Sequence, residues 1–123
     1  MFEICVEHTF AAGHALRNYH GKCENVHGHN YRVQVALEGL ELDENGLLFD
    51  FAELKQRLRA ATEYLDHNFI NDLKPFDEIN PSAENIAKFF YDELRKDLKS
   101  ASLSFVKVWE TDTSCATYRP AIR

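Results

Sequence analysis

With 123 residues, 45% of them hydrophobic, the chain fits a single domain over residues 1–123 with an ordinary core. Twenty acidic against fourteen basic residues give a formal net charge of −6 without a basic cluster, which argues against a nucleic-acid-binding surface. No apolar run approaches the ~20 residues of a membrane-spanning helix, and the acidic N-terminus lacks the basic start of a signal peptide. Three cysteines without CxxC spacing favour reduced thiols. We therefore expect a cytoplasmic protein without nucleic-acid or membrane partners.

Two strands and a helix are predicted in the first half of the chain. Residues 2–10 and 30–39 alternate apolar and polar side chains with a period of two, which is typical of strands. Residues 43–46, "DENG", have the composition of a turn. From Asp50, which can serve as an N-cap, apolar residues recur every three or four positions as far as Leu65, and this spacing predicts an amphipathic helix.

A second helix and two more strands are predicted in the second half. Residues 66–80 are rich in Asp, Asn and Pro and indicate a loop. In the segment "NPSAEN" (80–85), Asn80 or Ser82 can cap a helix that runs to about Lys99, and Pro81 suits its first turn. Strand patterns follow at 103–110 and 115–120. The predicted order is ββααββ, an α+β fold with antiparallel strands. Its unprotected strand edges favour a sheet that continues into a partner subunit.

Three histidines form the strongest candidate for a metal site. His27 and His29 stand two apart directly before the second alternating run, so on an extended backbone both imidazoles point to one face, ~6.5–7 Å apart. His14 follows the first strand and comes beside them if the two strands form a hairpin. Three imidazoles without a fourth protein ligand describe an open site, for which zinc is the default metal and cobalt, nickel or iron would also fit. Surface histidines without a metal are the alternative.

Four further residues have catalytic chemistry, each with a structural alternative. Cys23 is either a fourth zinc ligand or a free thiol whose pKa a nearby cation lowers. Asp66 and His67 are either a helix terminus with a favourable imidazolium or a base oriented by a carboxylate. Glu110 ends an apolar strand, where it is either solvated or binds two adjacent N–H groups of a flat heterocycle.

In their order along the chain, the segments "FAAGH", "CxxxHGH", "FDFAELK", "LDH", "NPSAEN" and "ETxxxxxxY" resemble the 6-pyruvoyltetrahydropterin synthase / 6-carboxytetrahydropterin synthase family of tunnelling-fold proteins. The resemblance covers nearly the full length. It implies ββααββ subunits with two helices on one face of the sheet. It also implies trimers closed into a barrel, two trimers stacked into a homohexamer, and active sites between subunits. The implied substrate is 7,8-dihydroneopterin triphosphate, and no redox cofactor is needed.

The resemblance also implies roles for single residues. The three histidines would hold Zn²⁺, and Glu110, with Thr111 beside it, would anchor the pterin through its amino-pyrimidine edge. Cys23 would be the catalytic base. His67 would be its partner in proton relay, and Asp66 would orient His67.

The loop before HGH separates the branches of this family. Three residues between Cys23 and HGH, as here, resemble the bacterial enzymes that make 6-carboxy-5,6,7,8-tetrahydropterin and acetaldehyde for queuosine, whereas 6-pyruvoyltetrahydropterin synthases usually have a longer gap. Another branch replaces the cysteine by glutamate and releases 6-hydroxymethyl-dihydropterin for folate synthesis. This chain has Glu24 directly after Cys23, so Glu24 is either a solvated loop residue or a second base.

The expected activity is therefore that of a zinc-dependent lyase of the 6-carboxytetrahydropterin synthase type. The alternatives are folate-type cleavage through Glu24 and 6-pyruvoyltetrahydropterin synthesis. A protein of another class, a non-catalytic zinc- or pterin-binding module, would use Cys23 as a fourth zinc ligand.

Overall fold

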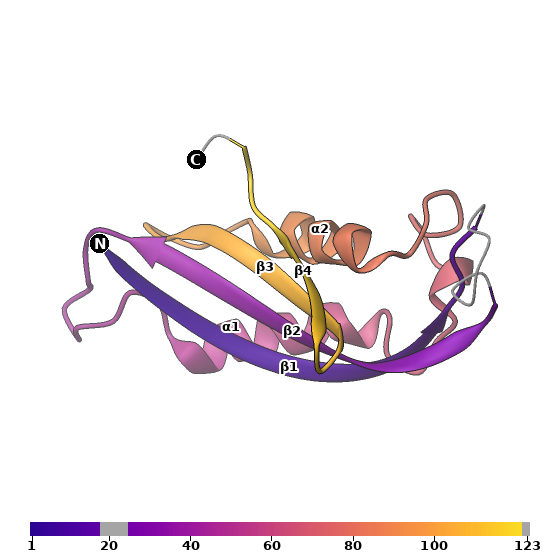
Figure 1. Ribbon diagram of the computed structural model, residues 1–123. Coiled ribbons are helices and arrows are strands. Elements are labelled where there is room, and N and C mark those ends of the chain that lie inside the picture. Colours follow the sequence, from indigo (N-terminus) through magenta and orange to yellow (C-terminus); the bar gives the residue numbers. More distant parts are fainter. Residues whose placement is uncertain (18–24, 122–123) are drawn as a thin grey trace.

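The computed structural model describes residues 1–17 and 25–121 (Figure 1). Within these ranges the order of elements is the predicted ββααββ, and the α+β prediction is confirmed. The elements are β1 (Phe2–His14), β2 (His27–Gly39), α1 (Phe51–Glu63), the 3₁₀ turn η2 (Ile70–Asp72), α2 (Ala83–Leu94), β3 (Ser102–Thr111) and β4 (Ser114–Tyr118).

The strands form one antiparallel sheet in the order β1-β2-β3-β4. β1 and β2 pair along their whole length, from Phe2 opposite Gly39 to His14 opposite His27. β3 pairs with β2 on one side and with the short β4 on the other. In Figure 1 the β1–β2 hairpin extends beyond β3 and β4 at the end where β2 begins.

The first two strands are longer than their alternation predicts. The pattern predicts strands over 2–10 and 30–39, but β1 runs to His14 and β2 begins at His27. The added residues include the segment 11–13, two alanines and a glycine, whose small side chains give no alternating signal. The backbone ladder continues through them nevertheless. This extension places His14 directly opposite His27.

Both helices begin at the predicted caps. The Asp50 carboxylate accepts a hydrogen bond from the backbone N–H of Ala52 at 3.0 Å, at the start of α1. The Ser82 hydroxyl accepts one from the backbone N–H of Asn85 at 3.1 Å, at the start of α2. Each bond satisfies a donor that the first turn of a helix leaves unpaired.

The second helix ends earlier than predicted. The apolar pattern predicts a helix to about Lys99, but α2 ends at Leu94. Asp97 and Lys99 have φ of 58° and 59°, in the left-handed region that interrupts an α-helix. The chain then turns into β3.

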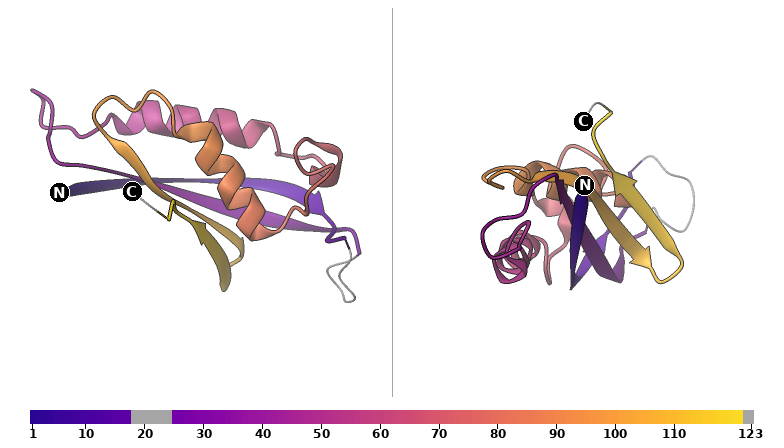
Figure 2. Two further views of the ribbon diagram at one scale, coloured as in Figure 1. Left: turned by 90° about the horizontal axis from the view of Figure 1, so that it is seen from above. Right: turned by 90° about the vertical axis from the view of Figure 1, so that its left-hand side faces the viewer.

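Both helices pack on one face of the sheet (Figure 2). α1 lies against β1, and α2 lies against β3 and β4. The core between the layers is apolar, and its fully buried strand residues are Tyr31, Val33, Val35, Leu37, Val106 and Val108. Residues one position away, such as Arg32 and Lys107, are half-buried on the opposite face. No helix in the described ranges is long and apolar enough to cross a membrane.

Candidate metal centre

The end of the β1–β2 hairpin brings the three predicted histidines into contact. His14 pairs with His27 across the two strands, and His29 follows two positions along β2 on the same face. The Nε2 atoms of His14 and His27 are 2.9 Å apart. The ring of His29 lies 5.1 Å from that of His14 and 4.7 Å from that of His27, measured between centroids.

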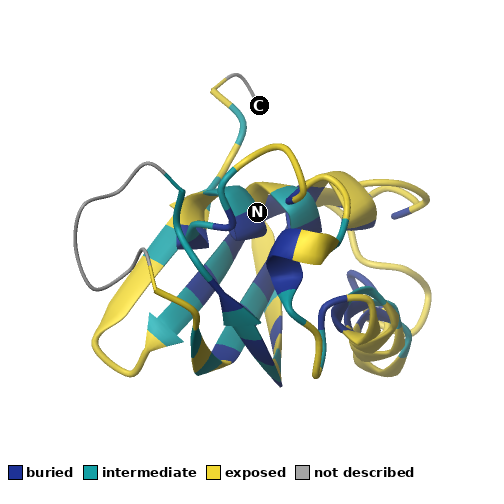
Figure 3. Cartoon of the chain, turned by 90° about the vertical axis from the view of Figure 1, so that its right-hand side faces the viewer, coloured by how far each residue is buried: buried dark blue, intermediate teal, exposed yellow. Residues whose placement is uncertain are grey.

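The three imidazoles lie on the face of the sheet that carries the core. Tyr31, two positions further along β2, is fully buried, and its ring meets the rings of His14 and His29 edge-on at 5.8 and 5.5 Å. His14 itself is only 1% exposed. Figure 3 views the molecule from this end, where more buried and less buried strand positions alternate. The period of two that builds the core thus continues into the histidine cluster.

A carboxylate completes the group. Glu110, at a β-bulge near the end of β3, places Oε1 3.0 Å from Nε2 of His29 and 3.6 Å from Nε2 of His14. One ligand atom from each of the four residues lies within 4.8 Å of the others. The sequence predicts Glu110 as a pterin anchor, separate from the metal ligands. In the structure its carboxylate lies against two of those ligands.

Burial favours the neutral form of two of the imidazoles. Desolvation lowers the pKa of His14 below its usual value of 6.5, although the hydrogen bond to the Pro81 carbonyl and the charge of Glu110 act in the opposite direction. Desolvation likewise lowers the pKa of His29, and the charge of Glu110 partly offsets it. Neutral imidazole is the form that binds a metal ion. These side chains therefore need no deprotonation at neutral pH to serve as ligands.

The group of residues fits a zinc ion. Three imidazole nitrogens with a carboxylate oxygen nearby are ligands that zinc accepts. Nε2 of His29 is buried and makes no hydrogen bond in the described part of the chain, although Oε1 of Glu110 lies 3.0 Å from it. A buried nitrogen without a hydrogen bond costs free energy, and a bound cation would offset that cost. The cluster can therefore hold a metal ion.

Asp66 and His67 lie along the outer edge of β1, close to this cluster. The Asp66 carboxylate accepts a hydrogen bond from the backbone N–H of Ala11 at 3.0 Å and lies 2.9 Å from Nδ1 of His67. The Ala11 N–H, and after it His67, hold the pKa of Asp66 below its usual range. His67 has φ of 58°, and its own N–H donates to the Ala11 carbonyl at 2.6 Å. The predicted contact between carboxylate and imidazole is present.

The His67 side chain is 81% exposed and faces a shared hollow. This hollow has a volume of about 570 Å³ and is lined by both His67 and His29, together with residues of β1, the start of β2 and Phe69. Among the four residues of the metal cluster, His29 alone is part of this lining, so the hollow lies between His29 and His67.

Three predicted site residues remain. Cys23 and Glu24 lie outside the described residues. Thr111 is exposed at the end of β3, and its hydroxyl accepts a hydrogen bond from the backbone N–H of Thr113 at 3.3 Å, within the β3–β4 turn.

Sequence reasoning missed the residues that hold His14. Nδ1 of His14 lies 2.7 Å from the carbonyl oxygen of Pro81, and Asn71 and Asn80 bind the backbone directly after His14. Asn80 and Pro81 open the segment "NPSAEN", which the sequence interprets only as a helix start. Only the fold brings this segment next to a histidine of β1, so the sequence alone gives no signal for this role.

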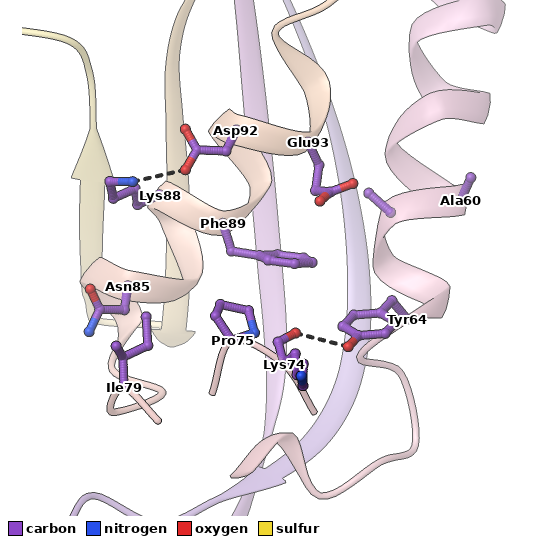
Figure 4. A pocket seen from close by; sticks show the side chains of 11 residues that line it. Ala60, Tyr64, Lys74, Pro75, Ile79, Asn85, Lys88, Phe89, Asp92 and Glu93 are labelled. Carbon is purple, nitrogen blue, oxygen red and sulfur yellow. Dashed lines mark hydrogen bonds and ion pairs between the residues drawn. The ribbon is translucent and has the colours of Figure 1, made fainter. Parts of the chain in front are cut away.

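A second cavity lies away from the histidines, between α1 and α2 (Figure 4). It has a volume of about 580 Å³, and the rings of Phe89 and Tyr64 stack at its wall with centroids 5.8 Å apart. Lys88 and Asp92 form an ion pair of 2.8 Å at its side. None of its lining residues is His or Cys. Among the described residues, the group suited to a metal is the one at the end of the hairpin.

Fold and site together define a tunnelling-fold subunit with a three-histidine cluster, the class to which pterin synthases belong. Residues 3–121 match the model of the 6-pyruvoyl tetrahydropterin synthase family, and the chain belongs to this family. The resemblance inferred from the segments is thereby confirmed.

Relatives and a solved structure agree with this assignment. The chain is 32% identical to a 6-carboxy-5,6,7,8-tetrahydropterin synthase of Haemophilus influenzae, over 97% of this chain and 99% of the relative. It is 38% identical to the 6-pyruvoyl tetrahydrobiopterin synthase of Homo sapiens, over 80% and 71%. The structure of the Caenorhabditis elegans 6-pyruvoyl tetrahydropterin synthase superposes with a TM-score of 0.84 at 28% identity, over 98% of both chains.

Proposed function

We propose that this protein is a zinc-dependent 6-carboxy-5,6,7,8-tetrahydropterin synthase. As a lyase of queuosine and 7-deazapurine biosynthesis, it would convert 7,8-dihydroneopterin triphosphate to 6-carboxytetrahydropterin, acetaldehyde and triphosphate. The observation that carries the proposal is the convergence of His14, His27 and His29 at the end of the β1–β2 hairpin of a family member. The short gap between Cys23 and HGH, and the name of the Haemophilus relative, support this branch.

The metal would be Zn²⁺, held by the three histidines. When bound, it supplies Lewis acidity toward an oxygen of the substrate side chain. The protein's part is to present neutral imidazoles, and burial disfavours the protonated forms of His14 and His29. Tyr31 and the core beneath it exclude water from that side of the cluster.

Proton transfer would be divided between two groups of this chain. Cys23 is proposed as the base, and Asp66 with His67 as the relay. The 2.9 Å contact places the Asp66 carboxylate on Nδ1 of His67, so that Nδ1 carries a proton and Nε2 is left to accept or return one. The bond from the Ala11 N–H fixes the carboxylate and keeps it ionised.

Glu110 is proposed to anchor the pterin, with Thr111 beside it. A carboxylate can accept two N–H groups from the amino-pyrimidine edge, as it does from a guanidinium. Its contact with His29 and His14 favours a second role, as a fourth metal ligand, and this would give the closed site of a non-catalytic binding module. Zinc content and turnover of Glu110→Gln separate the two roles. An anchor variant keeps its zinc and loses pterin affinity, whereas a ligand variant binds zinc more weakly.

The working form is proposed to be a cytoplasmic homohexamer, a dimer of trimers, in which each chain over 1–123 is a single domain. The edges of β1 and β4 support sheet continuation into neighbouring subunits. The outward imidazole of His67 supports an active site that a second subunit completes.

Two other activities share this site. The human relative, a 6-pyruvoyl tetrahydrobiopterin synthase, favours the corresponding activity as the second candidate. Glu24, directly after Cys23, favours cleavage to 6-hydroxymethyl-dihydropterin for folate synthesis, alone or as an additional activity.

The test is to incubate the zinc-loaded protein with 7,8-dihydroneopterin triphosphate and to identify the products by mass. Carboxytetrahydropterin with acetaldehyde supports the proposal. Pyruvoyl- or hydroxymethyl-pterin assigns one of the other activities, and absence of turnover with zinc bound favours a binding module. Cys23→Ala is expected to abolish turnover and retain zinc. Loss of zinc from this variant would contradict the role of Cys23 as a base.

A further inference from the structure

Two asparagine side chains extend the pairing of β1 beyond its last strand residue. Asn71 accepts a hydrogen bond from the backbone N–H of Ala15 at 2.9 Å and donates one to the Ala15 carbonyl at 2.8 Å. Asn80 does the same for Arg17, at 2.8 and 3.0 Å. A carboxamide offers one acceptor and donors on one edge, so each side chain replaces the peptide group of a neighbouring strand. The two rungs stand two residues apart, as in a strand ladder.

The side chain of Arg17 binds backbone carbonyls of the segment that carries these asparagines. Its guanidinium donates to the carbonyls of Asn71 at 3.3 Å, Phe76 at 2.7 Å and Ile79 at 3.1 Å. A guanidinium has five donors in a rigid plane, which suits it to gather several carbonyls. The loop from Asn71 to Asn80 is thus tied to the residues that follow His14.

The two rungs stand next to the two partners of one hydrogen bond, His14 and Pro81. Ala15, on the first rung, follows His14, and Asn80, on the second, precedes Pro81. Nδ1 of His14 lies 2.7 Å from the Pro81 carbonyl, and the histidine is 1% exposed. A carbonyl can only accept, so Nδ1 carries the proton and the lone pair of Nε2 is directed at the cluster.

We propose that Asn71 and Asn80 are positioning residues of the metal centre. They fix the backbone on both sides of the His14–Pro81 hydrogen bond, and so set the ring orientation and tautomer of His14 without touching the metal. Asn71 is 8% exposed, so water has little access to replace its two hydrogen bonds to Ala15. The inference rests on the proposed function, because it assumes that the cluster binds zinc.

The experiment compares zinc affinity in Asn71→Ala, Asn80→Ala and Leu98→Ala, by competition with a chromophoric chelator. Leu98 is a buried residue near the opposite end of the sheet, where Ser102 pairs with Glu38, so it controls for general loss of stability. Both asparagine variants are expected to bind Zn²⁺ about 10- to 100-fold more weakly than the wild type, the usual effect of removing an outer partner of a metal ligand. Leu98→Ala should lower the melting temperature and leave zinc affinity unchanged.

A second readout needs no metal. In the metal-free wild type, ¹⁵N spectra of the His14 ring should report a single tautomer with the proton on Nδ1, and the asparagine variants should report a mixture. If Asn71→Ala does not fold, Asn80→Ala, whose side chain is only half-buried, carries the test. Failure of the wild type to bind zinc would overturn the proposed function and this inference with it. Wild-type binding, with asparagine variants that match Leu98→Ala in affinity, would overturn the inference alone.

Discussion

Two stretches of one face of β2 have opposite characters. Val33 and Val35 are fully buried in the middle of the strand, beneath the helices. His27 and His29 stand on the same face at the strand end and are only half-buried, whereas His14, opposite His27 on β1, is buried and binds the Pro81 carbonyl of the loop before α2. The helices offer apolar side chains, whereas a loop offers backbone N–H and C=O groups. Whether a buried strand position can hold an imidazole thus depends more on the element packed over it than on the strand itself.

The sharpest test of this comparison is a pair of substitutions in β2. His29→Ala should abolish specific zinc binding and leave the fold intact, because its Nε2 makes no hydrogen bond in the described part of the chain. Leu37→Ala removes a fully buried side chain and should cost about 2–5 kcal/mol of unfolding free energy, while the folded fraction still binds zinc. Urea unfolding and zinc titration of both variants give the answer. Similar behaviour of the two would contradict a division of the strand into core and site.

Asp66→Asn tests the segment that follows α1 and binds the outer edge of β1. Turnover should fall about 10²- to 10⁴-fold, the usual contribution of an acid–base group. The pKa of Asp66 is lower in the folded state than in the unfolded chain, so its stabilising effect is complete above about pH 4 and is lost as the pH falls through the folded value. Unfolding measured from about pH 5 down to about pH 2 should therefore be less pH-dependent in the variant. An unchanged acid dependence would contradict a stabilising role for the hydrogen bond between the Asp66 carboxylate and the Ala11 N–H.

Zinc itself should stabilise the strand end. At a free concentration 100 times its dissociation constant, the ion should raise the unfolding free energy by about 2.7 kcal/mol, provided the unfolded chain does not bind it. Hydrogen exchange should localise the added protection to the amides around His14 and His27. Protection spread evenly over the helices would place the ion elsewhere.

The smallest expected effect lies on the opposite face of the sheet. The Arg32 guanidinium lies 3.7 Å from the centre of the Trp109 ring and 3.5 Å from the Glu7 carboxylate, in half-exposed surroundings. Arg32→Ala should cost about 0.5–1 kcal/mol, typical of an exposed cation–π contact, and leave zinc affinity unchanged. A larger loss in the isolated subunit, measured by urea unfolding, would contradict the view that this face adds little to the core.

Local sequence signals account for most of the fold. The caps at Asp50 and Ser82 were predictable because each acts within three residues of itself. The extension of β1 to His14 was not, because Ala11, Ala12 and Gly13 have no alternating pattern and are held by pairing with β2. Backbone pairing is a tertiary effect that single positions do not encode.

The site divides in the same way. His27 and His29 were predictable as a pair because a strand period of two puts them on one face. The approach of Glu110 to His29 depends on a bulge in a strand about eighty residues later in the chain, and was not predictable. The bonds of Asn71 and Asn80 span 56 and 63 residues, so only the folded chain brings them to His14.

The most direct test is anomalous diffraction at the zinc edge from crystals of the zinc-loaded protein. The account predicts a peak at the end of the β1–β2 hairpin, within bonding distance of Nε2 of His14, His27 and His29. A zinc ion bound away from this cluster, or a cluster that stays empty in zinc-soaked crystals, would contradict it.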